Sequence, residues 1–154
     1  MSNMRKKQIL WWCITIAIML LIFWFSAQNS AESSSLSRGV HGRLEAFLKL
    51  FGLQWLAQLE GFHGFIRKCA HAIAYFSLGF SAINATQNSK WKHAALLAWS
   101  ICILYAISDE VHQAFVPGRG PRVFDVILDS VSAAVGILVC LLVKKRLGLK
   151  SKEK

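Results

Sequence analysis

The stretch "SDEVHQAFVPGRGPRVFDVILD", residues 108–129, decides the fold because it is densely polar and lies between two apolar runs. "AALLAWSICILYAI" precedes it and "SVSAAVGILVCLLV" follows it. Apolar runs approaching about 20 residues are typical of helices that cross a lipid bilayer. The Pro117-Gly118 pair inside the stretch is typical of a turn. The pattern therefore predicts a hairpin of two membrane-spanning helices, with ionisable groups gathered at its tip.

Outward from this hairpin, the sequence predicts an all-α membrane protein built as a bundle of four transmembrane helices. We expect the spans at about 9–27, 65–85, 91–108 and 123–143, within one domain covering residues 1–154. The first and last are the clearest, and the third is the weakest because its apolar part is short. A hydrophobic share of 55% supports this interpretation over its alternative, a soluble helical domain with deeply buried helices.

The N-terminal run also resembles a secretory signal peptide, since a basic "RKK" precedes it. The run is long, however, and Trp11, Trp12 and Trp24 near its ends are typical of residues at a membrane interface. An uncleaved first span is therefore the favoured interpretation.

Residues 28–64 are expected to form an outer loop, and the polar run "SAQNSAESSSLS" at residues 26–37 leads into it. Within it, about residues 40–59 place apolar side chains at helical spacing, with charged and amide side chains largely on the other side. This predicts an amphipathic interfacial helix between the first and second spans. A lid packed on the spans is an equally good interpretation.

The distribution of positive charge predicts the orientation. The net charge is +10, and basic blocks flank the chain: "RKK" at residues 5–7 and "KKR" at residues 144–146. Lysine and arginine concentrate on the cytoplasmic side of membrane proteins, so we expect a multi-pass protein of the cytoplasmic membrane with both termini cytoplasmic. Nucleic acid is not an expected partner, because the basic residues are not interleaved with aromatic ones on one surface. The expected partner is the lipid bilayer, and the oligomeric state stays open.

The ionisable residues at the outer ends of spans two to four are expected to form one site. Groups of this kind near hydrocarbon are costly unless they are paired or face water, so their gathering is by default a site hypothesis. Candidates for proton transfer are His71, Asp109, Glu110 and His112, of which Asp109 and His112 form the best acid–imidazole pair. The candidate binding residues are Lys68, Tyr75, Gln113, Arg119, Arg122, Asp125 and Asp129.

Structural explanations stay open beside the functional ones. His71 could be a hydrogen-bonded structural residue, Glu110 could be solvated at the interface, and Asp125 and Asp129 could pair with nearby cations to hold the loop. The small residues Ser132 and Gly136 predict a close helix contact, with Gly79 of the second span as the expected partner.

No cofactor and no metal are expected, because the sequence has no HExxH motif and no phosphate-binding loop. Two histidines with carboxylates would also describe a loose metal site, but nothing in their local spacing favours it. Cys13, Cys69, Cys102 and Cys140 fall one in each span and are expected to be small packing residues rather than disulfides.

Two segments resemble signatures of the VanZ-like family. "RKCAHAIAYFSLG" is similar to its Lys-x-x-His-x-x-x-Tyr-x-x-x-Gly pattern, and "DEVHQAFVPGRGPRVFD" is similar to its second signature. The resemblance extends from about residue 23 to residue 143. The chain departs from the pattern after Asp125, where Asp129 and Ser132 stand in place of an asparagine and a glycine.

The resemblance implies a bacterial integral membrane protein of the cell envelope, and the member that gives the family its name is linked to low-level teicoplanin resistance. Three functions follow as hypotheses. The first is a non-enzymatic protein that lowers susceptibility to glycopeptide and lipoglycopeptide antibiotics. The second is a small membrane enzyme acting by acid–base chemistry on a lipid-linked or phosphate-bearing envelope substrate, whose partners would be a lipid-linked precursor or an anionic lipid. The third is a packing subunit of a membrane complex.

Overall fold

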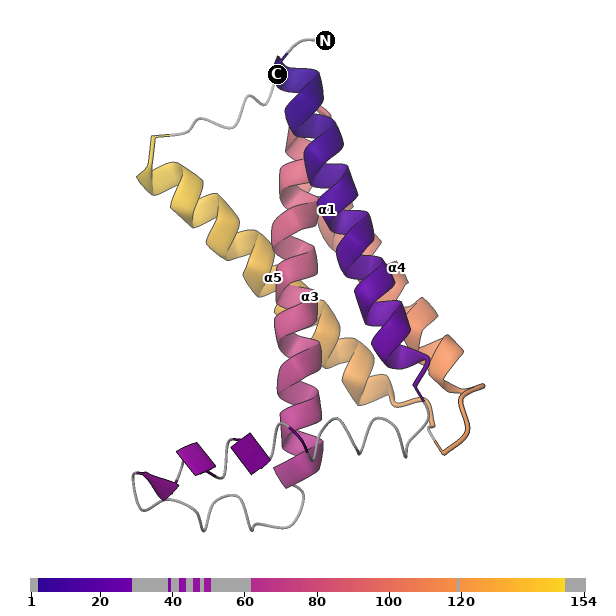
Figure 1. Cartoon of the computed structure of the whole chain (residues 1–154). Helices are drawn as coiled ribbons and strands as arrows, with labels where there is room; N and C mark the ends of the chain where they lie inside the picture. Colours follow the sequence, from indigo (N-terminus) through magenta and orange to yellow (C-terminus); the bar gives the residue numbers. More distant parts are fainter. Residues whose placement is uncertain are drawn as a thin grey trace.

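The computed structural model describes residues 3–28, 39, 42–43, 46–47, 49–50, 62–118 and 120–148. Four α-helices make up nearly all of these residues, which include no strand: α1 (Asn3–Ser26), α3 (Phe62–Asn88), α4 (Ala94–Gln113) and α5 (Val123–Arg146). The helices form one bundle (Figure 1). The expected interfacial helix at about 40–59 falls largely outside the described residues.

Helix α3 lies at the centre of the bundle. It packs against α1, α4 and α5, whereas α1 and α4 touch each other much less. Its second half is almost wholly buried, with Leu78, Ala82 and Ile83 at 0% exposure. The core of the protein is therefore the set of surfaces around α3.

Three of the helices, α1, α4 and α5, are long and apolar enough to cross a membrane. Their outward faces carry large apolar side chains such as Leu20, Leu104 and Val131, which are 63%, 67% and 55% exposed. Apolar faces of this extent are unfavourable in water and favourable in lipid. The chain is therefore a membrane protein.

The sequence had indicated the third span as the weakest, and this expectation is wrong. Helix α4 qualifies, and it continues past the expected end at residue 108 through Gln113. Helix α3 was expected to be the second span, but its composition does not place it among these three candidate spans. The physical reason is its central position: a helix covered by neighbours can carry Ser81, Asn84 and Thr86, all buried, without exposing them to lipid.

Helices α3 and α5 cross at a contact of glycine against backbone. A Cβ atom added to Gly79 would collide with the carbonyl of Ala133, and one added to Gly136 would collide with the carbonyl of Phe76. Glycine thus allows the two backbones to approach more closely than any other residue would. The close contact expected between the small face of the last span and Gly79 is confirmed.

Polar side chains that follow Gly79 on α3 also join this helix to its three neighbours. The Thr15 hydroxyl donates to the Ser81 hydroxyl over 3.2 Å, the Asn84 amide donates to Cys140 Sγ over 3.2 Å, and the Thr86 hydroxyl lies 3.0 Å from the Ala94 carbonyl. These bonds link α3 to α1, α5 and α4 respectively. Sequence reasoning missed them, because isolated small polar residues in apolar runs have no distinctive pattern.

The four cysteines differ in their exposure. Cys102 and Cys140 are buried, as expected of small packing residues, while Cys69 is partly buried. Cys13 is exposed on α1, so the packing role expected for it is wrong. All four have free thiols.

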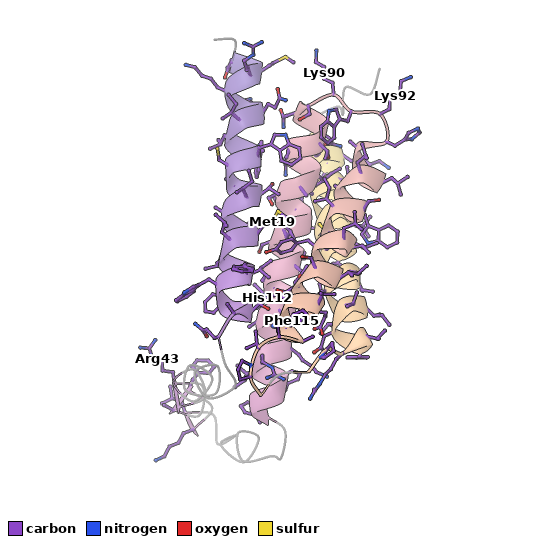
Figure 2. All side chains as sticks on the ribbon, turned by 90° about the vertical axis from the view of Figure 1, so that its right-hand side faces the viewer. Met19, Arg43, Lys90, Lys92, His112 and Phe115 are labelled. Carbon is purple, nitrogen blue, oxygen red and sulfur yellow. The ribbon has the colours of Figure 1, made fainter. Side chains whose placement is uncertain are left out.

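The start of α1 and the end of α5 lie at the same end of the bundle as the turn between α3 and α4. Trp12 donates to Ser89 over 3.0 Å, and Lys144 donates to Gln87 over 2.6 Å. Figure 2 shows Lys90 and Lys92 at this end and His112 and Phe115 at the opposite end. The helices therefore run alternately up and down, and the polar stretch at residues 108–129 lies away from the basic blocks.

Candidate functional site

A small pocket lies where the first half of α3, the α4–α5 turn and the start of α5 meet. Its volume is about 70 Å³, enough for several water molecules. Its lining consists mostly of polar and charged residues: Arg67, Lys68, His71, Gln113, Gly118, Gly120, Arg122, Asp125, Leu128 and Asp129. The polar gathering expected from the sequence thus encloses space for water or a ligand group.

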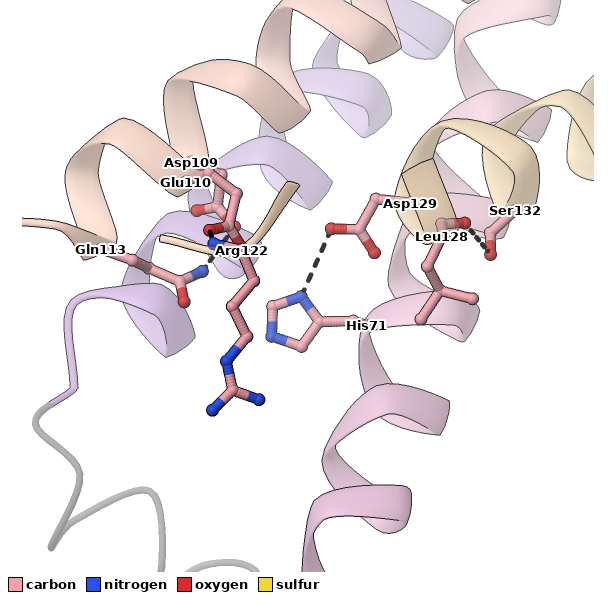
Figure 3. Close-up of polar contacts among 8 residues, drawn as sticks. All are labelled: His71, Asp109, Glu110, Gln113, Arg122, Leu128, Asp129 and Ser132. Carbon is pink, nitrogen blue, oxygen red and sulfur yellow. Dashed lines mark hydrogen bonds and ion pairs between the residues drawn. The ribbon is translucent and has the colours of Figure 1, made fainter. Parts of the chain in front are cut away.

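An ion pair between α3 and α5 lies at this pocket (Figure 3). His71 Nδ1 is 3.6 Å from Asp129 Oδ2, and the two side chains are 23% and 2% exposed. A carboxylate buried to this degree is costly without a counter-charge, so the imidazole is its natural partner. The sequence had suggested nearby Lys or Arg side chains as partners for Asp129, and for Lys68 and Arg122 that is wrong. Arg119 lies outside the described residues.

Asp109 and Glu110 point into the protein from the last turns of α4. Asp109 Oδ2 accepts a hydrogen bond from Gln113 Nε2 over 3.1 Å. Glu110 Oε2 accepts one from the backbone N–H of Arg122 over 2.6 Å, which fixes the start of α5 against the end of α4. Glu110 is only 6% exposed, so the idea that it is simply solvated is wrong.

His112 stands apart from the carboxylates. Its ring packs on Phe23 of α1, with centroids 4.6 Å apart, and its Nε2 has no hydrogen-bond partner. The expected Asp109–His112 pair is not formed, because Asp109 points inward and is bonded to Gln113, one turn further along the helix. His112 faces α1 instead.

The cations of the pocket come from two places. Arg67 and Lys68 lie in the first half of α3, and Arg122 precedes α5. The Lys68 ammonium lies 4.6 Å from the centroid of the Phe124 ring, a cation–π distance. Sequence reasoning did not include Arg67 among the site residues, although its position beside Lys68 would have justified it.

Two tyrosines lie deeper: Tyr75 belongs to the core, and Tyr105 packs against it. Tyr75 is fully buried and its hydroxyl has no hydrogen-bond partner. Its ring centroid is 6.4 Å from that of Tyr105, whose hydroxyl donates to the Met19 carbonyl over 2.5 Å. Tyr105 was not predicted, because a tyrosine within an apolar helix is usually a packing residue.

Three side chains from three helices could together hold a metal ion. His71 of α3, Asp109 of α4 and Asp129 of α5 each offer one ligand atom, and these atoms lie within 4.8 Å of one another. The expectation of no metal site rested on local spacing, which cannot register ligands that the fold collects from separate helices.

The sequence model of the family described as VanZ/LLP1 matches residues 11–144. The chain belongs to the VanZ-like family. No curated protein and no solved structure matches it. The matched range includes every candidate residue from Lys68 to Asp129, so the pocket lies within the region that defines the family.

The candidate residues of this VanZ-like chain fall into three sets. Those that line the pocket are Lys68, His71, Gln113, Arg122, Asp125 and Asp129. Tyr75, Asp109 and Glu110 are buried and are not part of the lining. His112 lies against α1. The arrangement can hold an anionic group near its cations, or hold a cation or a proton among its buried carboxylates.

Proposed function

We propose that the protein is a four-span integral membrane protein of the bacterial cytoplasmic membrane, with both termini cytoplasmic and the pocket open at the outer face. The arrangement of the cations supports this orientation. Lys90, Lys92 and the basic residues at the start of α1 and the end of α5 share one end of the bundle, which the positive-inside rule assigns to the cytoplasm.

Helix α3 is the proposed fourth span. Its 27 residues extend about 40 Å, more than the roughly 30 Å of a hydrocarbon core. It packs against α1, α4 and α5, the three helices that are apolar enough to cross the membrane. A helix that stayed outside the membrane could not pack alongside them in this way. Its polar groups bond to other helices, which removes the main cost of placing them in lipid.

Single-cysteine labelling tests this topology. On a background in which all four cysteines are replaced by alanine, we expect a reagent that cannot cross the membrane to label Gly120→Cys and not Lys90→Cys in intact cells. Both positions are exposed in turns between helices. If α3 remained outside the membrane, Lys90→Cys would be labelled and Gly120→Cys protected, so the reversed pattern would contradict the proposal.

The proposed role is to lower susceptibility to lipoglycopeptide antibiotics by binding an anionic group of an envelope lipid or lipid-linked precursor in the pocket. The observation that carries it is the set of cations in the lining: Arg67, Lys68 and Arg122. His71 offsets the charge of Asp129, so Asp125 is the main carboxylate opposing an anion there. Arginine and lysine form strong charge-assisted hydrogen bonds with phosphate and carboxylate groups.

The double variant Arg67→Gln/Lys68→Gln is expected to bind anionic lipid in nanodiscs at least about tenfold more weakly, because two charge-assisted contacts are lost. A strain that lacks the native gene and expresses this variant should also lose the protection against lipoglycopeptides that the wild-type protein gives. Native mass spectrometry and antibiotic susceptibility are the two measurements.

Arg43→Gln/Lys49→Gln is the matched control, because it removes the same charge from residues that do not line the pocket. Equal loss of lipid binding in both double variants would mean that general surface charge is responsible. Normal lipid binding with lost protection would separate the pocket from the antibiotic phenotype.

A second candidate function is acid–base catalysis on a lipid-linked or phosphate-bearing substrate. The observation that favours it is the His71–Asp129 pair at the pocket with Asp109 nearby. A carboxylate can orient an imidazole and raise its basicity, which suits a general base. Under this proposal His71→Gln would abolish turnover of the substrate while leaving its binding by Arg67 and Lys68 intact.

A further inference from the structure

We propose that His71, Asp109 and Asp129 bind one divalent transition-metal cation, with Zn²⁺ as the best-fitting ion. The three ligands come from α3, α4 and α5, so the ion would link the three helices that surround the pocket. No local motif marks this site, because each ligand lies on a different helix.

The spacing of the ligand atoms suits one ion. The candidate atoms lie within 4.8 Å of one another, and His71 Nδ1 is 3.6 Å from Asp129 Oδ2. Ligand atoms at about 2.0–2.2 Å from a tetrahedral Zn²⁺ are roughly 3.4 Å apart. A separation of 3.6 Å is longer than a good hydrogen bond but close to this value. Small side-chain movements would complete the geometry.

Buried oxygen atoms without partners provide a second, independent indication. Asp109 Oδ1 and Asp129 Oδ1 have no hydrogen-bond partner, although the two residues are only 5% and 2% exposed. The Tyr75 hydroxyl, one turn along α3 from His71, is also buried without a partner. Unsatisfied buried polar atoms are rare in native proteins and often indicate a missing ion or water.

The chemistry of the ligands selects the class of ion. Calcium takes six to eight oxygen ligands and magnesium keeps several waters, whereas an imidazole with two carboxylates suits zinc and its neighbours. Three protein ligands leave one coordination position open, as in sites where zinc binds a further group. His71 and Asp129 also line the pocket, so the ion would border the cavity that contains Lys68 and Arg122.

A bound cation would deepen the proposed function, because it would add positive charge beside the cations proposed to hold an anion. The metal proposal and the anion-binding proposal can nevertheless be tested separately, so that one can be wrong while the other holds. Metal binding is measured with the metal alone, and anion binding depends on Arg67 and Lys68, which are not ligands.

The experiment uses the full-length protein, purified in detergent, stripped with chelator and titrated with Zn²⁺. We expect one equivalent per chain by calorimetry and by elemental analysis after dialysis. Co²⁺ in place of Zn²⁺ should give the visible absorption bands of a low-coordinate site with nitrogen and oxygen ligands. This spectrum needs no variant, so it tests the proposal even if a substitution prevents folding.

Asp109→Asn and Asp129→Asn are expected to weaken Zn²⁺ binding at least about 100-fold, since even residues behind a metal ligand contribute 10–100-fold. Asp125→Asn is the matched control: it removes the same charge from the same pocket but lies outside the ligand set. Its affinity should fall by less than about tenfold, because losses of 10–100-fold are typical of residues hydrogen-bonded to a metal ligand and no such bond links Asp125 to the ligand set among the described residues. Absence of stoichiometric Zn²⁺ and of Co²⁺ bands in the wild type, or equal losses in Asp125→Asn and Asp129→Asn, would overturn the proposal.

Discussion

Replacing Gly136 by leucine is expected to destabilise the bundle more than any other single substitution considered in this chain. Any Cβ at this position meets the carbonyl of Phe76, and the backbone of Phe80 is the next neighbour at 3.1 Å. Backbone atoms cannot move aside as a flexible side chain can, so α5 would have to shift away from α3. Overpacking of this kind costs about 3 kcal/mol or more. Thermal unfolding in detergent, followed by tryptophan fluorescence, should show a melting temperature lower by roughly 10 °C.

Gly64→Leu provides the control for this prediction. Gly64 is also in a helix, but a Cβ there would meet nothing within 4 Å. Its melting temperature should stay near that of the wild type. Equal behaviour of the two variants would show that α5 does not approach α3 as closely as the glycine contact requires.

Replacing His71 by alanine in chelator-treated protein is expected to have the second-largest effect. Asp129, at 2% exposure, would lose the imidazole 3.6 Å away and remain as a buried charge without a partner. Breaking a buried pair in this way costs about 3 kcal/mol, whereas removing both members is often close to neutral. The double variant His71→Ala/Asp129→Asn should therefore melt at a higher temperature than His71→Ala alone. Chelator ensures that no bound cation contributes to the difference.

His112→Ala is the matched histidine control, because this ring packs on Phe23 and forms no ion pair with a carboxylate in the described part of the chain. A second substitution of Asp129→Asn should not rescue it. If His71→Ala were as stable as the wild type, Asp129 would be uncharged in the protein and the ion pair would not contribute to folding.

The helical bundle could be predicted in large part from the sequence, because its signal is local. A continuous apolar run is legible residue by residue, and α1 and α5 therefore stood out. Helix α3 was the difficult case. Whether a helix containing Asn84 and Thr86 lies in lipid or inside a bundle depends on its neighbours, which local composition does not reveal. The close approach at Gly136 was predictable from residue size, since only small residues permit it.

The site was predictable as a neighbourhood but not as a set of contacts. Ionisable residues at the same depth of three helices had to lie near one another, and the pocket contains most of them. The pairing within it depends on helix rotation. Asp109 and His112 are near neighbours in sequence, yet one faces the interior and the other faces α1. Conversely, His71 and Asp129 are far apart in sequence and meet only because α3 and α5 cross.

The central position of α3 bears on how the chain enters the membrane during synthesis. A helix emerging from the ribosome is sorted into lipid by its own hydrophobicity, and the start of α3 carries Arg67 and Lys68. Its bonding partners Ala94 and Cys140 lie on helices that are made later. The nascent α3 therefore has only α1 to shelter it at first. In the proposed four-span arrangement, its secure position in the bilayer therefore depends on the arrival of α4 and α5, and the pocket is completed only when α5 has been made.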